Sequence, residues 1–218
     1  MMSVSIILVE PENPDNIGAV ARAMKNMALS DLRLVQPPKH WQRLGKKMAM
    51  SGWGVLQKAR EFETLKEAVS DLRLVIGTTR RTGPKRGRFL DFDSAIEKIV
   101  QTASASRAKA ALVFGKESKG LDNPSLRLCD WATIIPANPD YPSLNLAQAV
   151  MIFAFSLFKA RLLCHCPTGA IPILRKFNDR WDCEEAACMS FPRKRESILN
   201  GSPIKSFGDD KSRQSLSS

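Results

Sequence analysis

Histidine and long hydrophobic runs are scarce in this sequence, and several common catalytic motifs are missing. The 218 residues contain only two histidines, His40 and His165, and no nucleophile with an evident histidine partner. The chain therefore offers little for histidine-based acid–base catalysis. It also has no Walker loop, no G-x-G-x-x-G fingerprint and no H-E-x-x-H helix. These absences favour a reaction in which the protein mainly binds, aligns and stabilises charge.

The hydrophobic runs are too short to cross a membrane. The longest, residues 149–158, falls well below the roughly 20 residues that a transmembrane helix needs. The first ten residues lack the basic leader of a signal peptide and become acidic at Glu10. We therefore expect a cytoplasmic protein with no membrane partner.

Cysteine is sparse and poorly spaced for metal binding. Five cysteines fit no complete disulfide framework, so thiols are expected. Cys129 is predicted to be a buried structural thiol. Cys164 and Cys166 flank His165, and Cys183 and Cys188 follow later in the sequence. These four lack the paired C-x2-C knuckles of zinc sites. No metal is expected, and a zinc site is the alternative.

Positive charge is plentiful. Lysine and arginine number 33 against 22 acidic residues, which gives a formal net charge of +11. Such an excess suits a nucleic acid partner, because neutralised phosphates release condensed counterions. The alternative is a basic surface or tail that binds nothing.

Hydrophobic patterns predict an alternation of strands and helices that is typical of an open α/β sheet. Strands are expected at residues 5–9, 32–35, 72–76, 110–114 and 132–135. Helices are expected at residues 15–28, 62–72, 92–102, 122–129 and 144–163. Asp15 or Asn16 is expected to cap the first helix, with Ala28 at the end of its buried stripe.

Residues 39–60 interleave aromatic and basic side chains and allow two interpretations. They could contact RNA by stacking and phosphate pairing. They could also form a helix whose Met48, Val55 and Leu56 face the core, and we favour this interpretation.

The stretch from residue 109 to residue 158 organises the chain. One apolar run ends at Gly115, a second ends at Pro136, and SLNLAQAV then opens a long helix. In open α/β sheets ligands bind beyond the carboxyl ends of strands. Residues 115–121 and 136–145 are therefore predicted to hold a cofactor.

The segment GTTRRTGPKRGR carries five positive charges after the third predicted strand. These are Arg80, Arg81, Lys85, Arg86 and Arg88. A solvated loop is the alternative, but the proximity to the predicted cofactor site favours contact with RNA.

Three ordered motifs, NIGAVAR, FGKESKGL and IIPANPDYPSLNLAQAV, resemble those of the SPOUT superfamily's ribose 2′-O-methyltransferases. The resemblance covers roughly residues 3–163 and is close to bacterial tRNA methyltransferases that modify the anticodon loop. It implies a parallel α/β sheet with a C-terminal trefoil knot, a homodimer, and S-adenosylmethionine (SAM) as methyl donor. The implied acceptor is a ribose 2′-hydroxyl of tRNA, at the pyrimidine in position 32. The alternatives are an rRNA methyltransferase and an inactive RNA-binding protein of the same fold.

The resemblance also implies site residues. The implied catalytic residues are Asn16, Arg22, Glu117 and Asn145, and Arg22 also joins the basic loop in binding RNA. The implied cofactor contacts are Thr78, Thr79, Arg80, Gly115, Glu117, Gly120, Ile135, Ser143, Leu144 and Asn145. Since a guanidinium keeps its proton, Arg22 would stabilise a developing alkoxide or grip a phosphate, and Glu117 would hold Arg22 or the substrate. Without the resemblance, Glu117 would be a surface carboxylate and Asn145 a helix cap.

Gly18 precedes Arg22 by one helical turn, so both share a face. A bare patch beside the guanidinium would let a sugar or phosphate approach. The alternative is that Gly18 permits close helix packing and Arg22 is a solvated charge.

The last part of the sequence differs in character. Residues 1–163 are expected to form the methyltransferase domain. Residues 164–218 have no sustained hydrophobic period, and Gly, Pro and Ser recur. We expect this tail to be poorly ordered.

Overall fold

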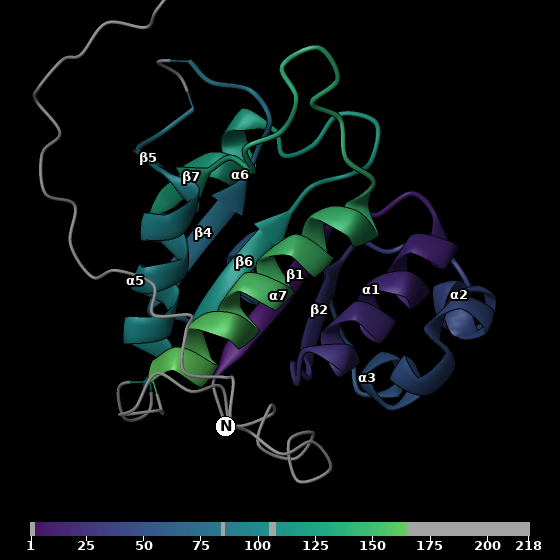
Figure 1. Cartoon of the computed structure of the whole chain (residues 1–218). Helices are drawn as coiled ribbons and strands as arrows, with labels where there is room; N and C mark the ends of the chain where they lie inside the picture. Colours follow the sequence, from purple (N-terminus) through teal and green to yellow (C-terminus); the bar gives the residue numbers. More distant parts are fainter. Residues whose placement is uncertain (1–2, 84–85, 105–107, 165–218) are drawn as a thin grey trace, which may run out of the picture. The chain divides into compact units, whose positions relative to one another are not determined.

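The computed structural model describes residues 3–83, 86–104 and 108–164 (Figure 1). Lys85 and nearly all of the predicted tail, including His165 and three of the cysteines considered for zinc, lie outside these residues. The described chain forms one seven-stranded sheet in the order β3-β2-β1-β6-β4-β7-β5. All its recorded strand pairs are parallel. The predicted parallel α/β sheet is therefore confirmed.

The strands are short and mostly buried. Their bounds are β1 Val4–Val9, β2 Asp31–Val35, β3 Arg60–Phe62, β4 Leu74–Thr78, β5 Phe89–Leu90, β6 Ala110–Phe114 and β7 Trp131–Thr133. The helices are α1 Pro14–Asn26, α2 Trp41–Ala49, α3 Trp53–Gln57, α4 Leu65–Ala68, α5 Phe92–Ser104, α6 Asn123–Arg127 and α7 Leu146–Cys164. A 3-10 turn, η1 Met50–Gly52, joins α2 to α3.

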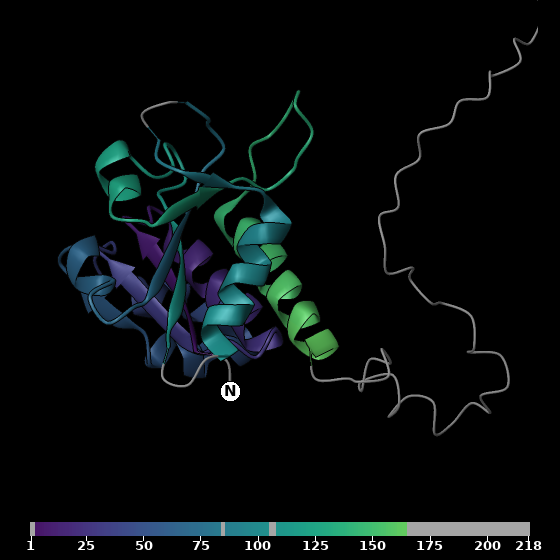
Figure 2. The same ribbon diagram turned by 90° about the vertical axis from the view of Figure 1, so that its left-hand side faces the viewer.

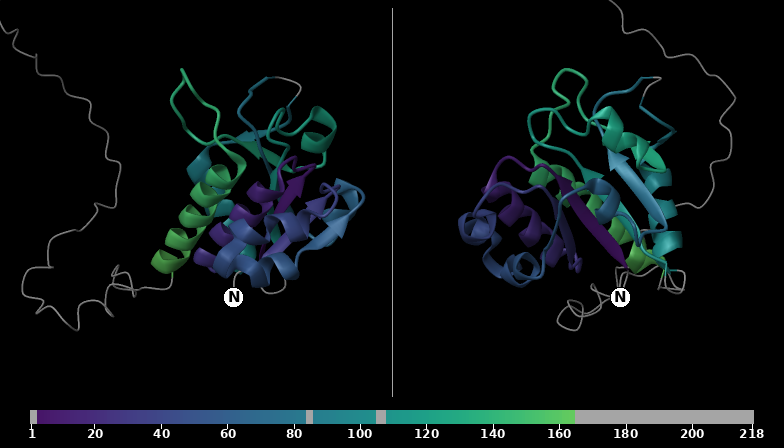
Figure 3. Two further views of the ribbon diagram at one scale, coloured as in Figure 1. Left: turned by 90° about the vertical axis from the view of Figure 1, so that its right-hand side faces the viewer. Right: turned by 180° about the vertical axis from the view of Figure 1, so that it is seen from behind.

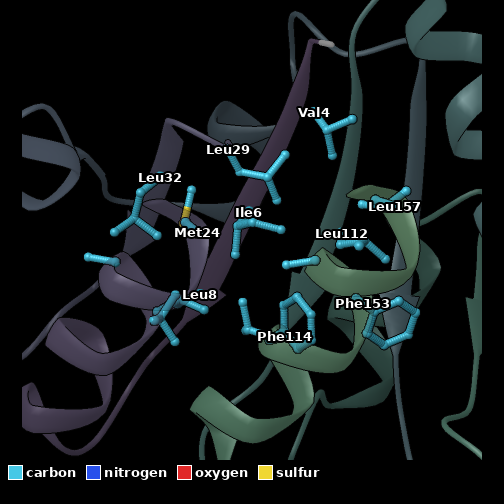
Figure 4. Close-up of a cluster of buried hydrophobic side chains, with 14 of the residues drawn as sticks. Val4, Ile6, Leu8, Met24, Leu29, Leu32, Leu112, Phe114, Phe153 and Leu157 are labelled. Atoms are coloured by element: carbon cyan, nitrogen blue, oxygen red, sulfur yellow. The ribbon is translucent and has the colours of Figure 1, made fainter. Parts of the chain in front are cut away.

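Alternate residues of the central strands enter two separate cores, as the two-residue period of a strand requires. Ile6 and Leu8 of β1 pack in a large core with α1, α2, α3, α5 and α7. Ile7 and Val9 enter a smaller core with α4 and α6 on the opposite face. Figure 4 shows part of the large core. Phe153 of α7 is fully buried in this core, with its ring centroid 5.7 Å from that of Phe114.

The helices α1 and α7 lie side by side over the large core (Figure 1). Viewed from the side, α5 runs along the same face (Figure 2). α7 is apolar on nearly all sides, and part of this apolar surface is open to solvent, since Phe155 is 52% exposed. Within the described residues, no helix combines the length and hydropathy that a membrane span requires.

The start and end of α1 differ from the prediction. Asn13 caps the helix, and its side chain accepts the Asp15 backbone N–H at 2.9 Å. Pro14 occupies the first turn, where a missing N–H costs nothing. The predicted caps Asp15 and Asn16 are therefore wrong. Ala28 lies beyond the helix, exposed and with a φ of 55°.

Other elements differ from the prediction because hydrogen bonds to neighbouring strands place some residues in the sheet. The helix expected at residues 62–72 shrinks to α4, because Phe62 belongs to β3, which pairs with β2. β5 was not predicted, and Ile135 lies beyond the end of β7. In residues 39–60, Val55 and Leu56 are buried as expected, but Met48 is 41% exposed.

A buried arginine joins β2 to the segment before β4. Arg33 is 1% exposed, and its guanidinium binds the carboxylates of Asp31 and Asp71 and the carbonyl oxygen of Ala68. Asp31 and Asp71 begin the two DLRLV segments of the sequence. Lys109 also donates to Asp71, at 2.8 Å. This buried charge is tolerated because its donors are engaged.

Candidate functional site

The main cavity of the described chain lies at the carboxyl ends of β4, β6 and β7, where an α/β sheet is expected to bind its ligand. Figure 3 shows the loops after β4 and β7 projecting from this same end of the sheet. The cavity has a volume of about 330 Å³. Its walls come from three loops, at residues 78–81, 114–120 and 134–144, together with the first turn of α7.

The predicted cofactor contacts gather in this cavity. Those in its lining are Thr78, Thr79, Arg80, Gly115, Glu117, Gly120, Ile135, Ser143 and Leu144. Asn145 is the one predicted contact outside the lining, and it lies between Leu144 and the first residue of α7. Lys116, Ser118 and Lys119 also line the cavity. They lie in the stretch 115–121 that was predicted to hold a cofactor, but none of them was singled out as a contact. Their only signal in the sequence was their position between the two motif glycines.

Two glycines shape the loop after β6. A Cβ on Gly115 would lie 2.1 Å from the Gly120 carbonyl carbon, so no side chain fits there. Gly120 has a φ of 68°, which favours glycine, and its N–H donates to the Lys116 carbonyl at 2.7 Å. The loop therefore closes on itself and presents its backbone to the cavity.

A chain of side-chain hydrogen bonds links the three motifs. Asn145 Nδ2 donates to Asn16 Oδ1 at 3.0 Å, and Asn16 Nδ2 donates to Glu117 Oε1 at 2.8 Å. Asn145 Oδ1 also accepts the Ala147 N–H at the start of α7. Asn145 is therefore both a helix cap and a partner of Asn16. Residues far apart in the sequence meet here because α1 and α7 both begin at the carboxyl edge of the sheet.

Glu117 also binds the backbone of the loop before α1. Its carboxylate accepts the Glu12 N–H at 2.7 Å and the Asn13 N–H at 3.4 Å. In return, the Glu12 carboxylate accepts the Ser118 N–H and hydroxyl. The hydroxyl hydrogen bond from Ser118 is the main cause that lowers the pKa of Glu12 below its usual range. Lys116 donates to Glu10, and this bond raises the pKa of Lys116.

Arg22 is exposed on α1, away from the cavity lining. No hydrogen bond or ion pair of its side chain is found within the described residues. The hydrogen bonds recorded for Glu117 there go to Asn16 and to the 12–13 backbone. Nearby, Gly18 is buried, and a Cβ on it would lie 2.1 Å from the Gly45 carbonyl oxygen of α2. The alternative that Gly18 permits helix packing is therefore confirmed.

The basic loop after β4 borders the cavity at one end. Arg80 and Arg81 line the cavity. Arg86 donates to the Thr79 hydroxyl at 2.8 Å. The Arg88 guanidinium carbon lies 4.4 Å from the ring centroid of Trp131, which is a cation–π arrangement. Thr78, at the base of the loop, donates to the Val113 carbonyl of β6.

Comparison with known proteins agrees with this architecture. Residues 3–155 match the SpoU rRNA Methylase family. The chain belongs to this family. The SpoU match covers every strand and every predicted catalytic residue, and it ends within α7.

Individual SpoU relatives are similar over the same region. The uncharacterized tRNA/rRNA methyltransferase LasT of Escherichia coli K12 is 39% identical over 158 residues, or 72% of this chain and 68% of LasT. The tRNA (cytidine/uridine-2′-O-)-methyltransferase TrmJ of Salmonella typhimurium is 38% identical over 162 residues, or 74% of this chain and 66% of that protein. The crystal structure of TrmJ from Z. mobilis ZM4 superposes with a TM-score of 0.66 at 32% identity, covering 81% of this chain and 80% of that one. About a third of each of the two sequence relatives thus has no counterpart in the aligned region.

Proposed function

We propose that this protein transfers a methyl group from SAM to a ribose 2′-hydroxyl of tRNA. The observation that carries the proposal is the convergence of the three motif loops on one cavity, with Asn16, Glu117 and Asn145 joined beside it. Membership in a methylase family and the similarity to TrmJ support the reaction and the class of acceptor. We propose the pyrimidine at position 32 as the target nucleotide.

The residues of the cavity suit a nucleoside cofactor. Ile135 and Leu144 provide apolar walls for an adenine ring, and the glycines of the loop after β6 leave its backbone accessible. Asn145 provides a polar group next to these walls. When bound, SAM supplies a methyl group already activated on a sulfonium. The protein then has to align the acceptor and stabilise charge.

We assign to Arg22 the stabilisation of the developing alkoxide or of the phosphate beside it. A guanidinium remains charged, and in the part of the chain that the structure describes no hydrogen bond or ion pair engages this one. Because Arg22 lies outside the cavity lining, we further propose a homodimer in which the site is shared between subunits. A trefoil knot in the C-terminal part of residues 1–163 completes the proposed domain.

The RNA would approach over the basic loop after β4 and contact Arg80, Arg81, Lys85, Arg86 and Arg88 there. It would also contact Arg22 on α1. Contacts to phosphate fix the position of an RNA without reading its sequence. An rRNA substrate is the second candidate, because the family that matches is described as one of rRNA methylases.

The test is transfer from methyl-labelled SAM to tRNA that lacks the modification, followed by mass spectrometry of the nucleosides. We expect a 2′-O-methylated pyrimidine. Labelling of rRNA in place of tRNA would support the second candidate. Binding of tRNA without binding of SAM would indicate an inactive RNA-binding protein and overturn the proposal.

A further inference from the structure

The loop before α1 and the loop after β6 hold each other through three successive residues. Lys116 donates to the Glu10 carboxylate at 2.6 Å. Glu117 accepts the Glu12 N–H at 2.7 Å. Ser118 donates to the Glu12 carboxylate twice, from its hydroxyl at 2.6 Å and from its N–H at 3.1 Å. Glu12 thus both donates, through its backbone N–H, and accepts, through its carboxylate.

The residues held in this way form a wall of the cavity. Lys116, Glu117 and Ser118 all line it. The bond from Gly120 to Lys116 closes the base of the loop, but it leaves residues 117 and 118 to be held from outside. Within the described residues, the hydrogen bonds recorded for the Ser118 side chain and N–H both go to Glu12. Glu12 therefore supports Ser118, while Glu117 is held by the Asn16 side chain and by the backbone N–H groups of Glu12 and Asn13.

The backbone before Glu12 supports the same interpretation. Glu10 has a φ of 47°, in the left-handed region that side-chain-bearing residues rarely adopt. Such conformations persist where the surrounding contacts determine them, and they cluster at functional sites. Here the Glu10 N–H is held by the Val35 carbonyl and its carboxylate by Lys116. The turn delivers the chain directly to Glu12.

We propose that Glu12 is a positioning residue for the cofactor cavity. By holding Ser118, it fixes the wall on one side of Glu117, whose carboxylate in turn holds Asn16. This inference rests on the proposed methyl transfer from SAM. Because Glu12 is exposed, its bonds compete with water and contribute little to global stability. Their effect is on geometry.

The test compares the full-length wild type with Glu12→Ala, Glu12→Gln and Ser118→Ala, by steady-state methyl transfer to tRNA and by thermal unfolding. We expect Glu12→Ala to raise the KM for SAM about tenfold, because small displacements of a binding wall cost affinity. The KM for tRNA should stay within about twofold and Tm within about 2 °C. Glu12→Gln keeps one of the two acceptor oxygens that Ser118 uses and should recover part of the loss.

A double-mutant cycle and a matched control complete the test. If Glu12 acts through Ser118, the effects of Glu12→Ala and Ser118→Ala on the KM for SAM will not add. Asp15→Asn is the control, since it removes a charge nearby and the Asp15 carboxylate makes no recorded hydrogen bond to the loop after β6 within the described residues. An active wild type with an unchanged KM in Glu12→Ala, or an equal change in Asp15→Asn, would overturn this inference alone. A wild type that neither binds SAM nor transfers methyl would overturn the proposed function and this inference with it.

Discussion

Arg22 and Arg33 lie on consecutive elements, α1 and β2, and the fold uses them in opposite ways. Arg33 is buried, and its guanidinium is engaged by two carboxylates and a carbonyl. Arg22 is exposed, and its side chain has no recorded partner within the described residues. Its backbone is nevertheless tightly packed, because a Cβ on Gly52 would lie 2.6 Å from the Arg22 nitrogen. An engaged arginine serves the fold, whereas a free arginine on a fixed backbone is available to a ligand.

Replacing Arg22 gives the largest expected effect. We expect Arg22→Ala to lower methyl transfer by about 10²–10³-fold, because it removes a charge positioned for the transition state. The affinity for SAM and the free energy of unfolding should barely change. Single-turnover transfer and calorimetric SAM titration will measure this. Full activity in the variant would remove Arg22 from the proposed mechanism.

Replacing Arg33 should lower the stability of the fold and leave methyl transfer by the folded protein unchanged. We expect Arg33→Met to lower the free energy of unfolding by about 2–3 kcal/mol, which is reduced from the usual range for a broken buried pair because Asp31 and Asp71 are partly exposed. Urea unfolding will measure this. Arg60→Ala is the control, since Arg60 binds Asp31 from the surface at 2.9 Å and should cost less than about 1 kcal/mol. Equal losses of unfolding free energy in Arg33→Met and Arg60→Ala would show that the buried arginine contributes no more than a surface one.

The contribution of Arg33 should depend on pH. Its hydrogen bonds hold the pKa of Asp71 well below the usual value of 3.8. The pKa of Asp31 is also lowered: burial raises it, but hydrogen bonds from Ser5, Arg60 and Arg33 outweigh that effect. A carboxyl with a lowered folded-state pKa stabilises the protein above its unfolded pKa and loses this effect as the pH falls. The stability difference between wild type and Arg33→Met should therefore shrink between about pH 5 and about pH 3. A constant difference would exclude the ionic contribution.

The last prediction concerns Cys129, whose thiol the fold keeps neutral, whereas Arg22 and Arg33 are charged. Its expected effect is confined to the reactivity of this one thiol. Burial raises the pKa of its thiol to about 12. The folded protein should therefore react slowly with iodoacetamide at about pH 8, since the thiolate is the nucleophile. Alkylation of the Cys129 peptide, followed by mass spectrometry, should be at least tenfold faster in urea, where the thiol is no longer buried and a larger fraction of it is thiolate. Equal rates would show that the thiol is accessible in the folded state.

The sequence predicted those elements whose own residues carry a strong pattern. β6 is a continuous apolar run, β1 is interrupted only by Ser5, and β2 carries Leu32, Leu34 and Val35. α7 follows its predicted range within a few residues. β3 and β5 were not predicted, because strands of three and two residues depend on their neighbours for pairing. Met48 was misplaced because α2 buries a narrow stripe at Trp41, Gly45 and Ala49.

The site could be predicted to the level of loops. Loops after apolar strands were expected to hold the cofactor, and these loops do line the cavity. The role of Glu12 left no signal in the sequence, since its partner Ser118 is 106 positions away. A hydrogen bond between distant loops follows from the tertiary fold and has no local pattern.

The hydrogen bonds between the loop before α1 and the loop after β6 also constrain the order of folding. β1 lies between β2 and β6, so the centre of the sheet stays incomplete until residues near position 110 have been synthesised. The cavity also needs Leu144, Leu146 and Ala149 for its lining, and Asn145 must be present to reach Asn16. Contacts over such distances form slowly, because the chain entropy of closing long loops must be lost first. A chain emerging from the ribosome can therefore bind cofactor only after nearly the whole of residues 3–164 has emerged, and cofactor binding reports a completed fold.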